Sequence, residues 1–197
     1  MTFLRPLTRS LALALLAMGL LPAAAAQQAI FLVRHAEKID ESMNGLDTPL
    51  SKAGKARARL LAETLRDSGI TAIYASPALR TQETAAPLAR VLGLQVRLIN
   101  QDYPRSVVAR LRANNTKDVV LIVGHSDTLP DILNELGYAP RVKIRSEEYS
   151  NLFLVIPRGD KPPSVLRLRF GENQGENDAR RKTPPPPRSK PSPAGQP

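Results

Sequence analysis

Short apolar runs alternate with amphipathic segments along most of this chain, and this alternation constrains its fold more than any other feature. Six runs have the length and composition of β-strands: 29–33, 72–76, 94–99, 118–124, 151–156 and 164–170. Four segments have the periodicity of α-helices: 51–68, 78–92, 106–113 and 129–136. Buried strands that alternate with helices predict a mainly parallel central sheet flanked by helices, which is a three-layer α/β sandwich.

The N-terminal segment 1–26 differs in composition from this alternating part. It has basic residues at Arg5 and Arg9, continues with an eleven-residue apolar stretch from Leu11 to Leu21, and ends in four alanines. This is the three-part pattern of a secretory signal peptide, and the apolar stretch is shorter than the roughly 20 residues that a transmembrane helix needs. We therefore predict a signal peptide, an exported protein that is periplasmic or secreted, and no stable membrane insertion after cleavage.

The C-terminal segment 172–197 has no apolar periodicity and is rich in proline and basic residues. Such a composition cannot bury enough apolar surface to offset the entropy of ordering, so we predict a disordered tail with polyproline stretches. Residues 27–171 then form one folded domain. Because the chain contains no cysteine, the stability of this domain depends on packing alone.

The formal net charge of +10 bears on the choice of ligand. Part of this charge lies in the two terminal segments, so the central domain has a modest positive field, which favours anionic ligands such as phosphates. Nucleic acid is disfavoured, because the chain has four Phe, four Tyr, no Trp and no stretch in which basic and aromatic residues cluster. The composition therefore favours a small anionic partner.

The histidines constrain the chemistry, because the chain has only two and each directly follows a predicted strand. His35 follows the first strand, with Arg34 before it, and His125 follows the fourth. Arg80 lies one turn into the helix after the second strand. Ligand sites in open α/β sheets form beyond the carboxyl ends of the strands, so we expect these two arginines and two histidines to converge. Guanidinium groups suit phosphate oxygens, which predicts a phosphate site.

A metal site is the competing interpretation of two histidines. Without cysteine, such a site would need a carboxylate as its third ligand, and the two neighbouring arginines would repel the cation. The sequence therefore predicts a site that needs no metal ion.

Four motifs carry a resemblance to a known family. They are "LVRHAEK" at 32–38, "TPLSKAGKARA" at 48–58, "SPALRTQETA" at 76–85 and "VGHSDTLP" at 123–130. In their order and spacing they resemble the histidine phosphatase superfamily, in its phosphoglycerate mutase-like branch. The resemblance implies the fold of that family and a metal-independent phosphatase acting on a small phosphorylated substrate.

The resemblance also implies a role for each residue of the cluster. His35 would attack the phosphorus and form a phosphohistidine, with a backbone carbonyl fixing its tautomer. Arg34, Arg80 and His125 would hold the phosphoryl oxygens and stabilise their charge. The two arginines should keep His35 unprotonated, whereas bound phosphate should favour a charged His125.

The leaving group needs a proton, and here the sequence departs from the family pattern. The phosphoglycerate mutase-like branch supplies this proton from a glutamate beyond the second arginine, whereas this chain has "RLINQDYPRS" at 97–106. Asp102 is the first candidate for the general acid, because a carboxyl group raised in pKa by burial can hold a proton. Asp127 is the second candidate. A third alternative is that the site has no dedicated acid and acts on labile donors such as phosphohistidine.

Two other functions are compatible with the motifs. One is a phosphate-recognising module on the same fold without turnover. The other is a phosphoglycerate mutase-type phosphotransferase. It is disfavoured by the short segment between Arg80 and His125, which leaves little room for a cap that encloses the substrate.

Other charged residues near the motifs have simpler interpretations. Glu37 and Glu83 are expected to orient neighbouring groups or to cap helices rather than to react. The first helix carries four basic residues that are expected to form a solvent-exposed face: Lys52, Lys55, Arg57 and Arg59.

Overall fold

The computed structural model describes residues 29–99, 103–114 and 118–171. The predicted signal peptide, the predicted tail at 172–197 and the candidate acid Asp102 lie outside these residues. No helix in this part of the chain is long and apolar enough to cross a membrane.

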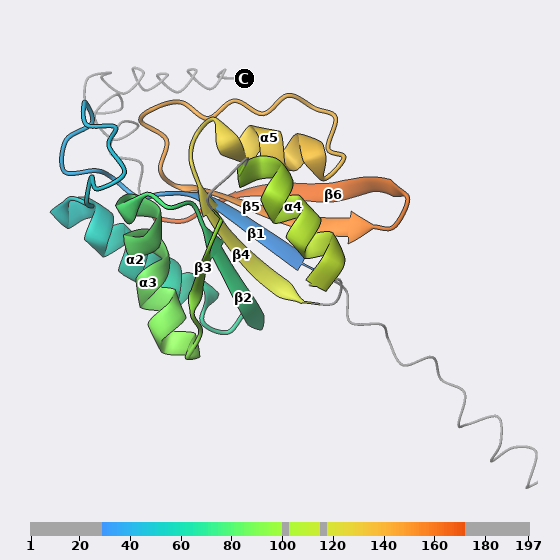
Figure 1. Ribbon diagram of the computed structural model, residues 1–197, viewed down its shortest axis with the longest axis horizontal. Helices are drawn as coiled ribbons and strands as arrows, with labels where there is room; N and C mark the ends of the chain where they lie inside the picture. Colours follow the sequence, from blue (N-terminus) through green and yellow to red (C-terminus); the bar gives the residue numbers. More distant parts are fainter. Residues whose placement is uncertain (1–28, 100–102, 115–117, 172–197) are drawn as a thin grey trace, which may run out of the picture.

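The described residues alternate between strands and helices in the order that the sequence predicts. The strands are β1 (Ala29–Arg34), β2 (Ile70–Ala75), β3 (Val96–Leu98), β4 (Val119–Gly124), β5 (Asn151–Arg158) and β6 (Lys161–Arg169). The helices are α2 (Lys52–Leu65), α3 (Leu79–Leu92), α4 (Tyr103–Asn114) and α5 (Thr128–Glu135). Figure 1 shows α2 and α3 on one face of the sheet and α4 and α5 on the other. The predicted three-layer α/β sandwich is thus confirmed.

The sheet has the strand order β3-β2-β4-β1-β5-β6. Strands β3, β2, β4 and β1 run parallel, whereas β5 is antiparallel to both of its neighbours, β1 and β6. The sheet is therefore mixed, with a parallel centre. In the central pair β1 and β4, Arg34 lies opposite Gly124, so both strands end at the same level. This register makes neighbours of the residues that follow the strands, His35 and His125.

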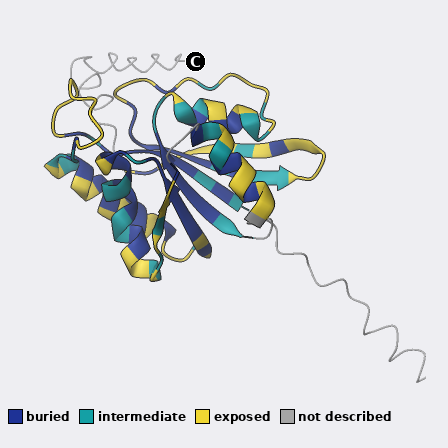
Figure 2. Cartoon of the chain, in the orientation of Figure 1, coloured by how far each residue is buried: buried dark blue, intermediate teal, exposed yellow. Residues whose placement is uncertain are grey.

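Two apolar clusters fill the spaces between the layers. Residues of β1 alternate between them, with Ile30 and Leu32 on the side of α4 and α5 and Val33 on the side of α2 and α3. Strand β4 divides its residues in the same way, which is why neither face of this strand is polar. Figure 2 shows the central strands buried along most of their length. Because this burial is the main source of stability, it also fixes the strand ends that carry the histidines.

Helix α2 closely approaches the segment after β1. Ser51 caps the helix, because its hydroxyl accepts a hydrogen bond from the backbone N–H of Gly54 at 3.0 Å. The backbone N–H of Ser51 donates to the carbonyl oxygen of Glu37 at 2.9 Å. A side chain on Gly54 would collide with that carbonyl group. Glycine at this position therefore lets α2 dock against the residues that follow His35.

The prediction of a solvent-exposed basic face on α2 is correct for three residues and wrong for Arg57. The exposed residues are Lys52, Lys55 and Arg59. Arg57 is only 8% exposed, because it forms a bidentate ion pair with Glu37 in which Nη2 lies 2.7 Å from Oε1. Glu83 accepts a hydrogen bond from the backbone N–H of Leu50 at 2.6 Å. Both glutamates therefore orient the main chain and side chains around the site.

Candidate active site

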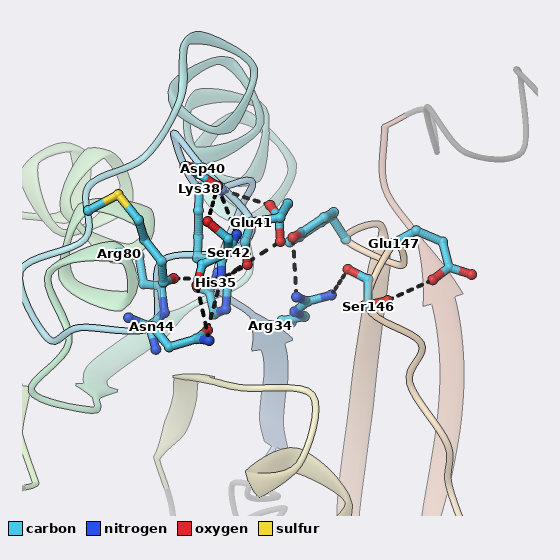
Figure 3. A network of polar contacts seen from close by, with 12 residues as sticks. Arg34, His35, Lys38, Asp40, Glu41, Ser42, Asn44, Arg80, Ser146 and Glu147 are labelled. Carbon is cyan, nitrogen blue, oxygen red and sulfur yellow. Dashed lines mark hydrogen bonds and ion pairs between the residues drawn. The ribbon is translucent and has the colours of Figure 1, made fainter.

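Four of the predicted site residues lie together at the carboxyl edge of the sheet. They are Arg34 at the end of β1, His35 after it, Arg80 in the first turn of α3, and His125 after β4. The imidazole rings of His35 and His125 have their centroids 5.3 Å apart. Figure 3 shows how Arg34, His35 and Arg80 lie relative to the loop that carries Lys38. The structure thus brings together the two arginines and two histidines that the sequence singled out.

His35 is buried, with 4% of its surface exposed. Its Nδ1 lies 2.8 Å from the carbonyl oxygen of Ala36, and because a carbonyl only accepts, Nδ1 carries the proton and Nε2 is bare. Burial lowers the pKa of His35 to about 3, and the charges of Arg34 and Arg80 act in the same direction. At neutral pH the ring is therefore an uncharged imidazole with its lone pair on Nε2, which is the form that a nucleophile requires.

Arg34 is held by the segment before β5. Its Nη1 donates to the carbonyl oxygens of Arg145 and Ser146, at 3.2 and 2.6 Å. Its Nη2 donates to the hydroxyl of Tyr149 at 3.2 Å, and the guanidinium carbon lies 4.0 Å from the centre of the Tyr149 ring. These contacts fix the guanidinium plane. Sequence reasoning did not single out Tyr149, because it lies outside every motif and far from Arg34 in the chain.

Arg80 depends on the loop between β1 and α2. Its Nη1 donates to the carbonyl oxygen of Gly45 in that loop at 2.8 Å. The loop itself is organised around the buried Lys38, whose Nζ donates to three of its oxygens. Burial lowers the pKa of Arg80, and the nearby charge of Arg34 adds to this effect. The two arginines are therefore close enough to repel one another.

Both arginines have a buried donor without a partner. The Nε atoms of Arg34 and Arg80 are buried, and neither has a hydrogen-bond partner among the described residues. Buried polar groups nearly always have partners, and an unpaired donor on a buried cation is costly. Two like charges with spare donors, placed beside two imidazoles, form an environment that an oxyanion completes.

His125 is held by hydroxyl groups rather than by a carbonyl. Its Nε2 lies 2.8 Å from Oγ of Ser76, and its backbone N–H donates to Oγ1 of Thr128 at 2.9 Å. Burial lowers the pKa of His125 to about 4, and Arg80 acts in the same direction. Unless an anion lies next to it, this ring is neutral at pH 7.

Of the two candidate acids, Asp102 and Asp127, only Asp127 is among the described residues. Asp127 is exposed and caps α5, where its Oδ1 accepts a hydrogen bond from the backbone N–H of Thr128 at 2.8 Å. Its charge acts to raise the pKa of His125, so the carboxylate is within electrostatic reach of the site. Asp127 therefore has a capping role that does not depend on proton transfer.

A cleft with a volume of about 700 Å³ lies next to the site, although its lining includes neither of the two arginines nor either histidine. Tyr149 lines this cleft, and its ring centroid lies 6.0 Å from that of His35. Other lining residues include Glu41, Ser42 and Glu147. Within the residues that the structure describes, no group of three or more His, Cys, Asp or Glu is placed to hold a metal ion.

The fold is that of an α/β protein in which two arginines and two histidines meet at the carboxyl edge of the sheet. Residues 30–101, less than half of the chain, match the histidine phosphatase superfamily (branch 1). Similar relatives include "Probable phosphoglycerate mutase GpmB" of Yersinia enterocolitica, 39% identical over 71 residues, and phosphoserine phosphatase 1 of Hydrogenobacter thermophilus, 38% identical over 82 residues. These matches cover 34% and 38% of this chain. They span only 33% and 39% of the two relatives.

Solved structures share the fold over a longer span. The protein histidine phosphatase SixA, in complex with tungstate, has a TM-score of 0.59 at 20% identity, and the match covers 72% of this chain and 96% of SixA. A mycobacterial glucosyl-3-phosphoglycerate phosphatase in complex with VO3 has a TM-score of 0.56 at 18% identity, with 71% of this chain and 96% of that protein covered. These two structures show that the chain shares their fold.

Proposed function

We propose that the protein is a phosphatase that hydrolyses phosphomonoesters, or labile phosphoryl groups, through a phosphohistidine on His35. The observation that carries this proposal is the bare Nε2 of His35 beside two arginines whose buried Nε donors have no partner among the described residues. A nucleophile without a proton and guanidinium groups with spare donors are together complementary to a phosphoryl group.

The reaction would proceed in two displacements. First, the lone pair on Nε2 of His35 attacks phosphorus, the N–P bond forms, and the P–O bond to the leaving group breaks. Arg34, Arg80 and His125 hold the equatorial oxygens and stabilise their charge during the transfer. Water then attacks the phosphohistidine, the N–P bond breaks, and inorganic phosphate leaves. The hydrogen bond from Nδ1 to Ala36 stabilises the positive charge that the ring gains when Nε2 bonds to phosphorus.

The leaving alkoxide needs a proton, and we propose Asp102 as its donor. The support is its position in the sequence, in the zone where the phosphoglycerate mutase-like branch has its glutamate. Asp127 is the alternative donor, because its charge acts on His125. The loss of either aspartate should matter most for substrates whose leaving group needs a proton.

The organic part of the substrate would occupy the cleft beside Tyr149. The volume of this cleft, about 700 Å³, is in the range of small-molecule sites. This supports a small phosphorylated substrate rather than a macromolecule.

We also propose that the protein acts after export and without a metal ion. The signal-peptide pattern of residues 1–26 supports export, and sequencing of the N-terminus of protein recovered from the periplasm or the medium tests it. The two arginines and His125 support metal independence, because they offer the positive charge that a metal ion supplies in other phosphatases.

The central experiment is a screen of the mature protein against a panel of phosphate esters, phosphohistidine included, with and without a chelator. We expect turnover that the chelator does not change, and a phosphoryl label on the protein that His35→Ala lacks. Binding of phosphate with no turnover of any substrate would instead favour a recognition module. Movement of the phosphoryl group between hydroxyls of phosphoglycerate would favour a mutase. Activity lost with the chelator and restored by zinc would favour a metal site.

A further inference from the structure

Two buried hydroxyl groups connect His125 to the start of α3. Ser76 follows β2 and is 4% exposed, and its Oγ lies 2.8 Å from Nε2 of His125 and 3.0 Å from Oγ1 of Thr81. Thr81 is fully buried, and its Oγ1 lies 2.6 Å from the carbonyl oxygen of Ala78 and 2.8 Å from that of Ser76. None of these contacts belongs to the phosphate clamp itself.

The hydrogens in this series of contacts can be assigned starting from Thr81, because two of its oxygen partners are carbonyl groups. Carbonyl oxygens only accept, and two of them lie 2.6 and 2.8 Å from Oγ1 of Thr81, so the single hydroxyl hydrogen of Thr81 is donated to these carbonyl groups. Thr81 therefore has no hydrogen left for Ser76, so the 3.0 Å contact between the two hydroxyls is a hydrogen bond in which Ser76 donates to Thr81. Ser76 then has only lone pairs to offer His125, so Nε2 of His125 carries the proton.

We infer that Ser76 and Thr81 are positioning residues that hold His125 in the tautomer opposite to that of His35, with its proton on Nε2 and with Nδ1 as the ring nitrogen available to bound phosphate. His35 has its proton on Nδ1, because of the carbonyl group of Ala36, and its bare atom is Nε2. The two imidazoles of the site thus present different nitrogens for different tasks. The part of this inference that concerns phosphate rests on the proposed function.

The tautomer of His125 determines how this ring can bind phosphate. A bare Nδ1 cannot donate to a phosphate oxygen, so His125 must gain a proton when phosphate binds. A phosphate monoanion carries that proton on one of its oxygens, and its transfer to Nδ1 gives a dianion paired with an imidazolium. The imidazolium then donates from Nε2 to Ser76 and from Nδ1 to the phosphate. A phosphomonoester loses its second proton with a pKa of about 6, and inorganic phosphate does so at a somewhat higher pH, so above these values binding must take up a proton from solvent.

The tautomers can be measured directly, because the chain has only two histidines. Nitrogen-15 spectra of the ligand-free protein, assigned with a His35→Asn variant, should show His35 protonated on Nδ1 and His125 protonated on Nε2. Both rings in the same tautomer would overturn the inference without any variant being made. This measurement needs no turnover, so its failure and the failure of the proposed function are distinguishable.

Variants then test which residue sets the tautomer. Thr81→Val removes the acceptor for Ser76, which frees the serine hydrogen to donate to Nε2, so His125 should shift to the form protonated on Nδ1. Thr81→Ser keeps the hydroxyl and is the matched control, in which His125 should be unchanged. A His125 that remains protonated on Nε2 in a folded Thr81→Val variant would remove Thr81 from the assignment.

Binding of inorganic phosphate gives the functional measurement. Calorimetry near pH 8, in two buffers that differ in ionisation enthalpy, should show close to one proton taken up per phosphate in the unmodified protein and in Thr81→Ser. Uptake should fall clearly in Thr81→Val, whose neutral His125 already has a hydrogen on Nδ1. Ser76→Ala should weaken phosphate binding about 10-fold, the usual effect of losing a hydrogen bond to a charged group. Equal proton uptake in Thr81→Val and Thr81→Ser would overturn the link between tautomer and binding.

Discussion

The two sides of the site are held by different kinds of contact. On the β1 side, Arg34 and His35 are held mainly by carbonyl oxygens of the main chain. On the α3/β4 side, Arg80 has one carbonyl partner and His125 is held through the hydroxyls of serine and threonine. Every residue has a carbonyl group, so the β1 side keeps its partners when neighbouring side chains change. A single substitution can remove a hydroxyl, so the contacts that hold the α3/β4 side can be changed one at a time by mutation.

The largest expected effect compares the two histidines. His35→Ala should lower the hydrolysis of nitrophenyl phosphate by on the order of 10,000-fold or more, because the covalent route is lost. His125→Ala should lower it by about 100- to 1,000-fold, the usual cost of removing one donor to the charge of the transition state. Steady-state kinetics on both variants, with melting temperatures to check folding, measure this difference. Substantial turnover in a folded His35→Ala protein would remove His35 as nucleophile.

The second effect concerns the proton of the leaving group. If Asp102 is the donor, Asp102→Asn should slow an alkyl phosphate by about 100- to 10,000-fold, because that alkoxide leaves poorly without a proton. A nitrophenyl phosphate should lose far less, since its leaving group is a stable anion. Asp127→Asn is the matched control on the α3/β4 side, and it keeps the cap of α5 because Asn caps helices as well as Asp does.

Two outcomes would change this assignment. Leaving-group dependence in Asp127→Asn alone would move the acid to the α3/β4 side. Its absence from both variants would mean that the site has no dedicated carboxyl acid, and phosphohistidine or other labile donors would become the expected substrates.

The third effect compares the two arginines. Lysine cannot form the planar fork of arginine, so Arg34→Lys and Arg80→Lys should each lower kcat/KM by about 10- to 100-fold. Arg34→Lys should also lower the free energy of unfolding, by about 2 kcal/mol more than Arg80→Lys, because Arg34 has hydrogen bonds to two carbonyl oxygens and to the Tyr149 hydroxyl whereas Arg80 has one carbonyl partner. Urea denaturation measures this difference, and equal stability of the two variants would show that the carbonyl contacts of the β1 side do not hold it.

The same contrast explains what the sequence predicts well. Strands β1 and β4 are apolar on both faces, so their place in the centre of the sheet is visible in the sequence, and with it the level at which His35 and His125 lie. Arg34 and Arg80 follow from their positions next to strand ends. These predictions depend on local pattern and on the geometry of parallel sheets, which leave few alternatives.

The partners of these residues are less predictable from sequence. The contact between Arg34 and Tyr149 joins residues 115 positions apart, and no local pattern marks the tyrosine. The sequence predicts that Arg57 is exposed on α2, but in the structure Arg57 is buried and forms an ion pair with Glu37. Such contacts depend on the direction in which each side chain points after the layers have packed, and that direction has no signature of its own in the sequence.

The last comparison concerns the pH dependence of stability, and it tests the burial of both sides at once. The pKa values of His35 and His125, about 3 and about 4, lie below the value of about 6.5 for an exposed histidine. The unfolded chain therefore binds protons that the folded chain does not, so this contribution is fully present above pH 6.5 and is lost as the pH falls. Each histidine should contribute a slope of at most about 1.4 kcal/mol per pH unit, ending near pH 4 for His125 and near pH 3 for His35.

Urea denaturation between pH 7 and pH 4 measures this slope, with His35→Asn/His125→Asn as the control that has no histidine left to titrate. Carboxylates titrate in both proteins and largely cancel from the difference between them. Saturating inorganic phosphate should abolish the contribution of His125 to the pH dependence of the unfolding free energy, because bound phosphate stabilises the charged form of His125. The contribution of His35 should remain. Equal slopes in the two proteins without phosphate would mean that the imidazoles are hydrated in the folded state. The bare nitrogen of His35 would then be protonated in mildly acidic solution, and the β1 side would not hold a nucleophile ready for attack.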